Sequence, residues 1–180
     1  MKLIIIEGCD GTGTTTHAES LAVALCRGGY AALAYHHPPH PPGCTHWERS
    51  LHYALARARV CSKLRDTDAV LVADRWYHST WAYTAALTGE PVRVAMLGLS
   101  LYENSILLPI TFAVMLDAPD EILDARLRER GRDPTADERV IRNGYRGYLA
   151  GSMEAIVDTA APCEAVGARL LELSIAALRA

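Results

Sequence analysis

The chain has 180 residues, half of them hydrophobic, and a formal net charge of -3. This length suffices for one domain with a core, so we expect a single domain over residues 1–180. The negative charge argues against a protein that coats nucleic acid, and we expect a small-molecule partner. Five cysteines without a CxxC pair indicate neither a disulfide framework nor a zinc ribbon. Without a membrane-length apolar run, we expect no membrane partner and a cytoplasmic location.

Short apolar runs alternate with longer helical segments along the chain. The runs predict strands buried on both faces at residues 3–6, 30–35, 69–73, 110–116 and 155–157. The segments between and after them predict helices at 15–27, 46–64, 80–87, 92–107, 119–129, 137–153 and 162–178. This order predicts an α/β fold with a five-stranded parallel sheet flanked by helices. Ligands are expected beyond the carboxyl ends of the strands.

A glycine-rich segment, IIIEGCDGTGTTTHAESLA, follows the first expected strand. Gly8, Gly13 and Thr15 match the phosphate-loop pattern G-x-x-x-x-G-K-[ST], in which backbone N–H groups curl around phosphates and the hydroxyl holds magnesium. Thr14 stands where that pattern has its lysine. An ordinary glycine- and threonine-rich turn between a strand and a helix is the alternative interpretation.

A second segment, VLVADRWYHSTWAYTAA, places an acidic and a basic residue at the end of a buried strand. The Asp74 carboxylate can orient a magnesium-bound water or the attacking oxygen, and the Arg75 guanidinium offers a planar fork to a phosphate. A surface salt bridge at the strand end is the alternative.

Further along, ARLRERGRDPTADER concentrates basic residues at a helix end and the following loop. The spacing suits a mobile lid, at about residues 128–137, that closes on phosphates. A solvated basic helix end would show the same composition. The basic residues are Arg126, Arg128, Arg130 and Arg132.

Prolines exclude regular structure from the loop HHPPHPPGCTH at residues 36–46. Its histidines and Cys44 could form a zinc cluster, but structural zinc ligands usually come as two spaced pairs, and the prolines leave little freedom to wrap an ion. We favour a histidine, His37, beside the acceptor of a transferred group.

In this order, the three segments resemble the thymidylate kinase family of nucleoside monophosphate kinases. IIIEGCDGTG is similar to the family's opening strand and loop, DRWYHSTWAYT to its DR(Y/F)xxSxxAYQ segment, and the arginine-rich segment to its lid. The resemblance extends to the closing strand and helix in IVDTAAPCEAVGARLLEL. It implies a P-loop kinase fold that uses ATP and Mg²⁺ to phosphorylate a deoxypyrimidine nucleoside monophosphate, with dTMP or a 5-substituted analogue as first candidate.

The resemblance also implies residue roles. Catalysis would depend on Asp74, Arg75, Arg128, Arg130 and Arg132, and Mg²⁺ would be held by Thr15 and Asp74. Arg126 would stack on the adenine, and ATP would further contact Gly8, Gly11, Thr12, Gly13, Thr14, Thr15 and Thr16. The acceptor would contact Asp10, His37, Tyr53, Arg57, Arg75, Tyr83 and Thr84. For Tyr53, plain core packing is an equal alternative.

The chain departs from the family in four places: the missing lysine, HHPPHPPG in place of an Arg-Glu-Pro-Gly segment, Thr84 in place of glutamine, and a shorter stretch before Tyr53. Two alternatives therefore stay open. One is a kinase for a base-modified or polymer-borne pyrimidine nucleotide, although the negative charge speaks against a nucleic-acid acceptor. The other is a catalytically attenuated nucleotide-binding regulatory protein. A homodimer also stays open.

Overall fold

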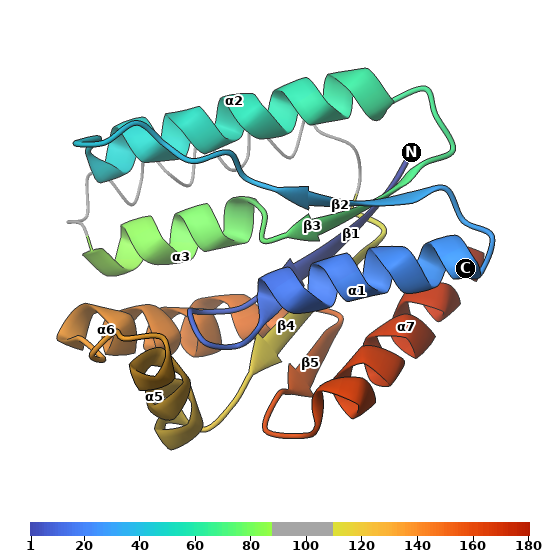
Figure 1. Ribbon diagram of the computed structural model, residues 1–180. Helices are drawn as coiled ribbons and strands as arrows, with labels where there is room; N and C mark the ends of the chain where they lie inside the picture. Colours follow the sequence, from blue (N-terminus) through green and yellow to red (C-terminus); the bar gives the residue numbers. More distant parts are fainter. Residues whose placement is uncertain (88–109) are drawn as a thin grey trace.

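The computed structural model describes residues 1–87 and 110–180. Their strands form one parallel sheet, in the order β2-β3-β1-β4-β5 (Figure 1). The strands are β1 (Lys2–Glu7), β2 (Ala32–His36), β3 (Val70–Asp74), β4 (Phe112–Asp117) and β5 (Ala155–Asp158). The predicted α/β class and five-stranded parallel sheet are confirmed.

The helices largely follow the sequence pattern. Their bounds are α1 (Thr14–Arg27), α2 (His46–Leu64), α3 (Tyr77–Leu87), α5 (Asp120–Glu129), α6 (Ala136–Gly144) and α7 (Cys163–Arg179). Helix α3 begins three residues before the prediction of 80–87. The predicted helix 92–107 lies outside the described residues.

The predicted helix 137–153 is only partly α-helical. After α6 the chain continues as a π-helical turn, Tyr145–Leu149, and a 3₁₀ turn, Ala150–Ser152. Glycines at positions 144, 147 and 151 lower the α-helical propensity of this stretch. The widened turn carries Tyr145, which is buried and whose hydroxyl hydrogen-bonds to Ser79.

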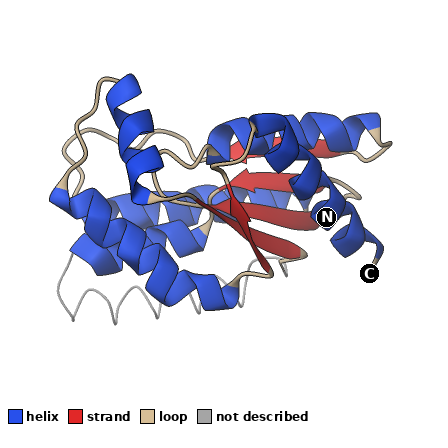
Figure 2. Ribbon diagram, turned by 90° about the horizontal axis from the view of Figure 1, so that it is seen from below, coloured by secondary structure: helices blue, strands red, loops and turns tan. Residues whose placement is uncertain are grey.

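Helices cover both faces of the sheet (Figure 2). Side chains that alternate along the strands pack on one face against α1 and α7, as Ile4 and Ile6 do with Leu21 and Leu170. The other set, such as Ile5, packs against α2 and Trp76. Because both faces are buried, the strands are almost continuously apolar.

The strand register brings the expected site together. Ile6 of β1 lies opposite Asp74 of β3, and Asp74 lies opposite His36 of β2. The three strands are parallel, so their carboxyl ends meet at one edge of the sheet. The phosphate loop that follows β1 opens at this same edge.

Candidate active site

A cavity of about 430 Å³ lies at this edge. From the phosphate loop and the end of β3 it is lined by Asp10, Gly11, Gly13, Thr14, Thr15, Thr16, Asp74 and Arg75. From the predicted acceptor and lid residues it is lined by His37, Tyr53, Tyr83, Thr84, Arg130 and Arg132. Five predicted residues do not line it: Gly8, Thr12, Arg57, Arg126 and Arg128.

The phosphate loop needs its glycines for two different reasons. A Cβ on Gly8 would lie 2.4 Å from Oγ1 of Thr12 and 2.9 Å from the carbonyl oxygen of Leu116, so no side chain fits there. Gly13 has a φ of 86° and caps α1 without a side-chain hydrogen bond. The first N–H groups of α1 have no acceptor within the helix, and such groups at a helix start bind anions.

Thr15 and Asp74 meet beside this loop. The Thr15 hydroxyl donates a 2.6 Å hydrogen bond to Oδ2 of Asp74, and His36 Nδ1 lies 3.1 Å from the same oxygen. Burial raises the pKa of Asp74, but hydrogen bonds from Thr15, Thr14 and His36 outweigh it and leave the pKa below its ordinary value. Asp74 is therefore a carboxylate at neutral pH.

Two observations fit these side chains to Mg²⁺. Oδ1 of Asp74 is buried and has no hydrogen-bond partner, so its lone pairs are available to coordinate a cation. The other contributor, Thr15, offers a hydroxyl oxygen, and Mg²⁺ prefers oxygen ligands.

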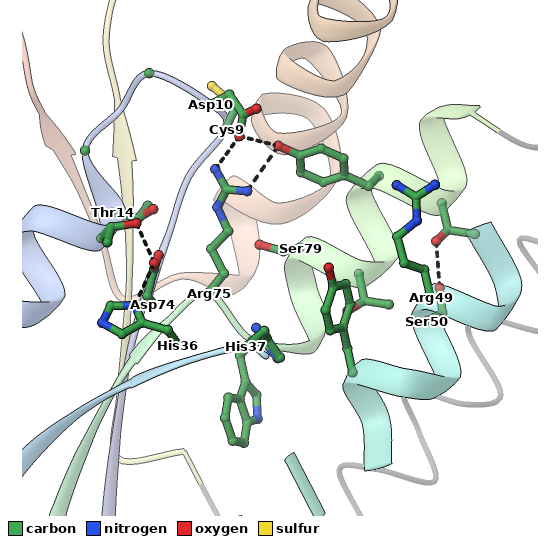
Figure 3. Close-up of a pocket in the computed structure, with 18 of the residues that line it drawn as sticks. Cys9, Asp10, Thr14, His36, His37, Arg49, Ser50, Asp74, Arg75 and Ser79 are labelled. Carbon is green, nitrogen blue, oxygen red and sulfur yellow. Dashed lines mark hydrogen bonds and ion pairs between the residues drawn. The ribbon is translucent and has the colours of Figure 1, made fainter. Parts of the chain in front are cut away.

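Arg75 lies at the centre of the cavity wall (Figure 3). Its Nη2 donates to Oδ1 of Asp10 at 2.7 Å, its Nη1 donates to the Tyr83 hydroxyl at 3.2 Å, and that hydroxyl donates to Asp10 at 2.9 Å. Burial raises the pKa of Asp10, but Arg75 and the hydrogen bonds outweigh it and lower the pKa to about 2.

The backbone of Arg75 is unusual. Its φ is 66°, the left-handed region, and it is the one non-glycine residue there among those that the structure describes. Such a conformation costs on the order of 1–3 kcal/mol and occurs often at functional sites. The following turn is held by the buried carboxylate of Glu7, which accepts from the backbone N–H of Trp76 at 2.7 Å.

The predicted lid is the loop between α5 and α6. Arg132 donates to Oδ2 of Asp10 at 3.0 Å and to Glu138 at 2.7 Å, so this loop already contacts the phosphate loop. Arg130 also lines the cavity, whereas Arg128 is exposed and lies outside it. The structure thus brings two of the three predicted catalytic lid arginines to the cavity.

Arg126 occupies a different position. Its guanidinium donates to the carbonyl oxygen of Gly11 at 3.2 Å and to Oγ1 and the carbonyl oxygen of Thr159 at 3.1 and 2.6 Å. It connects the phosphate loop to the residue after β5. Stacking of Arg126 on an adenine stays a prediction.

At the acceptor side the aromatic residues form one wall. The ring centroids of His37 and Tyr53 lie 4.9 Å apart, and those of His37 and Trp76 lie 6.2 Å apart. Burial lowers the pKa of His37 to about 3, and the nearby charge of Arg57 acts in the same direction. His37 is therefore neutral at physiological pH and offers a hydrogen bond rather than a charge.

Arg57 lies behind this wall. Its side chain is fully buried, and its Nη1 contacts Nε2 of His37 and donates to the Thr80 hydroxyl, both at 3.1 Å. Because arginine can only donate, Nε2 of His37 accepts and the ring proton is on Nδ1. In the structure Arg57 orients His37 and does not line the cavity. Direct contact of Arg57 with the acceptor stays a prediction.

Thr84 lies at the end of the cavity near α2. Its hydroxyl lies 3.2 Å from that of Ser50, and both side chains are buried. The sequence did not predict a site role for three residues: Glu7 and His36, which end β1 and β2, and Arg49 of α2. Glu7 could have been found, because a carboxylate that closes an apolar strand needs buried partners.

The histidine loop divides between two environments. His36 faces Asp74, and His37 joins the aromatic wall. Within residues 1–87 and 110–180 there is no group of three or more His, Cys, Asp or Glu side chains that could hold a metal ion. In that same part of the chain, no helix has the length and apolar character needed to cross a membrane.

Comparisons with known proteins agree with this arrangement of elements. No protein-family model matches the chain. The chain is similar to two proteins named thymidylate kinase, from Xylella fastidiosa strains 9a5c and M12. Each is 28% identical over 201 aligned positions, which cover 98% of this chain and 92% and 88% of the two relatives. This similarity over nearly the whole chain supports a nucleotide kinase function.

Proposed function

We propose that this protein transfers a phosphoryl group from ATP to a deoxypyrimidine nucleoside monophosphate, with dTMP or a 5-substituted analogue as the first candidate. The observation that carries the proposal is the 2.6 Å hydrogen bond between Thr15 of the phosphate loop and Asp74 of β3. It joins the two expected magnesium ligands beside a helix N-terminus that is open to phosphate.

In this proposal, the loop from Gly8 to Thr16 binds the phosphates of ATP. Thr15 and Asp74 would hold Mg²⁺, which supplies positive charge to the phosphates when it is bound. Arg75, in the adjoining wall, would bind the acceptor phosphate through its planar guanidinium. Asp10 and Tyr83 hold that guanidinium in place through two hydrogen bonds.

The missing lysine does not leave the phosphates without cations. Thr14 is buried and helps to lower the pKa of Asp74, so its side chain supports the carboxylate and adds no charge. Arg130 and Arg132 line the same cavity from the lid. We propose that they supply the charge that a loop lysine supplies elsewhere.

The experiment is a substrate panel with purified protein. ATP, Mg²⁺ and each nucleoside monophosphate are combined, and ADP release and product formation are measured. We expect turnover that requires a deoxypyrimidine acceptor and Mg²⁺. Nucleotide binding without ADP release, unchanged in Asp74→Asn, would instead favour the regulatory protein.

A further inference from the structure

The cavity has two ends of different chemistry. Thr14 and Asp74 lie at the phosphate-loop end, and Arg49 and Ser50 of α2 lie at the opposite end (Figure 3). Arg75 belongs to the phosphate-loop end through its contact with Asp10, and the aromatic wall adjoins α2, which carries Tyr53. An acceptor whose phosphate is bound by Arg75 can therefore extend its remaining atoms toward the second end.

Arg49 is poorly satisfied at this opposite end. Its Nε is buried without a hydrogen-bond partner, and its Nη2 makes one long contact, 3.4 Å, to the carbonyl oxygen of Cys44. No carboxylate pairs with it among the residues that the structure describes. By contrast, Arg75 and Arg132 each bind a carboxylate, Asp10 in both cases.

The place of Arg49 on its helix adds to this argument. It lies in the first turn of α2, next to the capping box that Thr45 and Glu48 form. A cation at a helix N-terminus is disfavoured by the helix dipole, so helix stability does not account for an arginine there. The guanidinium thus places a positive charge at this end of the cavity.

Two hydroxyl groups line the same cavity as the guanidinium. Ser50 and Thr84 contact one another through their hydroxyl groups and line the same end of the cavity. The Ser50 hydroxyl donates to the carbonyl oxygen of His46 at 2.8 Å, so Thr84 donates to Ser50 in the contact between them, and the donors for an anion at this end come from the guanidinium. A guanidinium with unused donors matches a carboxylate or phosphate through parallel hydrogen bonds.

We propose that Arg49 binds a second anionic group of the acceptor, remote from the phosphate that is phosphorylated. The identity of that first phosphate rests on the proposed function. The acceptor is then a nucleoside monophosphate with a further carboxylate or phosphate. This anion can be a substituent of the base or a phosphate on the 3′ oxygen of the sugar.

Calorimetry on the full chain tests this with Mg²⁺ and a non-hydrolysable ATP analogue present. The three ligands are dTMP, 5-carboxy-deoxyuridine monophosphate and thymidine 3′,5′-bisphosphate. One doubly anionic ligand binds at least about 10-fold more tightly than dTMP, since a charge-assisted fork is formed. Which of the two gains affinity identifies the source of the anion.

Variants then assign the gain to the side chain. In Arg49→Gln, the doubly anionic ligand no longer binds more tightly than dTMP. In Arg59→Gln, a matched change at an exposed position of α2, it still does. Arg49→Lys retains part of it, because the charge remains but the fork is lost.

Equal affinities of all three ligands for the natural protein would overturn the proposal. So would tighter binding of a doubly anionic ligand than of dTMP in Arg49→Gln. If Arg49→Gln does not fold, the ligand series and Arg49→Lys still decide. Failure of the proposed function is a separate result. That result is the absence of ADP release with every acceptor. The binding comparison does not require ADP release, so the two failures are measured independently.

Discussion

The phosphate-loop end of the cavity and its opposite end are built in different ways. The first comes from segments that follow neighbouring strands, so the sheet register and the short phosphate loop bring Thr15, Asp74 and Arg75 together. The second combines α2, α3 and the loop after β2, where His37 and Thr84 meet residues distant in the sequence. Chemistry shared with other kinases is expected at the first end, and substrate choice at the second.

The largest expected effect concerns the lid. Arg130→Ala combined with Arg132→Ala lowers kcat by ~10³-fold, because arginines delivered to a transferring phosphoryl group are worth that much or more. Arg128→Ala, on the same segment but outside the cavity, changes kcat by only a few-fold. Steady-state kinetics with saturating ATP measure all three proteins.

A substitution of Thr14 in the phosphate loop provides a second test of this prediction. Thr14→Lys restores the usual point charge, so the lid variants lose less activity in that background than in the natural one. If the double lid variant turns over at nearly the natural rate without Thr14→Lys, the lid does not compensate for the lysine.

Next in size is the carboxylate that the strand register places beside the loop. Asp74→Asn keeps the shape but removes the negative charge that would hold Mg²⁺, and kcat falls by about 10²-fold or more. Asp68→Asn, an exposed position before β3, is the control. An Asp74→Asn enzyme with natural Mg²⁺ dependence would show that another residue holds the metal.

Substitutions of two arginines distinguish a residue that contacts the acceptor directly from one that acts through another side chain. Arg75→Ala raises the KM for the acceptor by roughly 10- to 100-fold and leaves that for ATP nearly unchanged, because one charge-assisted fork is lost. Arg57→Ala acts through His37 instead. It lowers the free energy of unfolding by about 1–3 kcal/mol, because buried donors and acceptors lose their partner. Kinetics combined with denaturant unfolding distinguish the two, and equal losses of ATP affinity would contradict both assignments.

The sequence predicts the sheet and the phosphate-loop end well for a physical reason. Alternation of apolar runs and helices determines a parallel sheet, and the carboxyl ends of its strands must meet. Asp74 and Arg75 lie near the loop because β3, which they follow, is the neighbour of β1 in the sheet.

The opposite end was harder to predict. Arg57 and Tyr53 are four residues apart and share one helix face, yet the helix meets the sheet so that Tyr53 lines the cavity and Arg57 is buried. Arg49 extends the same face by one more turn and reaches the cavity instead. Helix periodicity gives the face but not how deep each turn lies, because that depends on packing between distant segments.

The smallest expected effect is a difference in how pH affects the two ends. At the phosphate-loop end, the pKa of Asp10 is lowered to about 2, so the stability it contributes is complete above its ordinary pKa of 3.8 and is lost as pH falls toward 2. At the opposite end, burial lowers the pKa of His37 from 6.5 to about 3. The unfolded chain therefore binds this proton first, and stability decreases as pH falls below about 6.5.

His37→Gln tests that difference because it removes the titrating ring. Between about pH 6.5 and about pH 5, above the range of the carboxylates, the variant loses less stability than the natural protein. Burial also lowers the pKa of His17, so the stability of both proteins still decreases to some extent as pH falls. His40→Gln, in the same loop as His37, serves as the matched control, and denaturant unfolding at several pH values gives the slopes. A slope in His37→Gln equal to that of the natural protein would show that His37 is not held neutral by burial. The aromatic wall would then be open enough to solvate a charged imidazole, and His37 could offer a charge as well as a hydrogen bond to the acceptor.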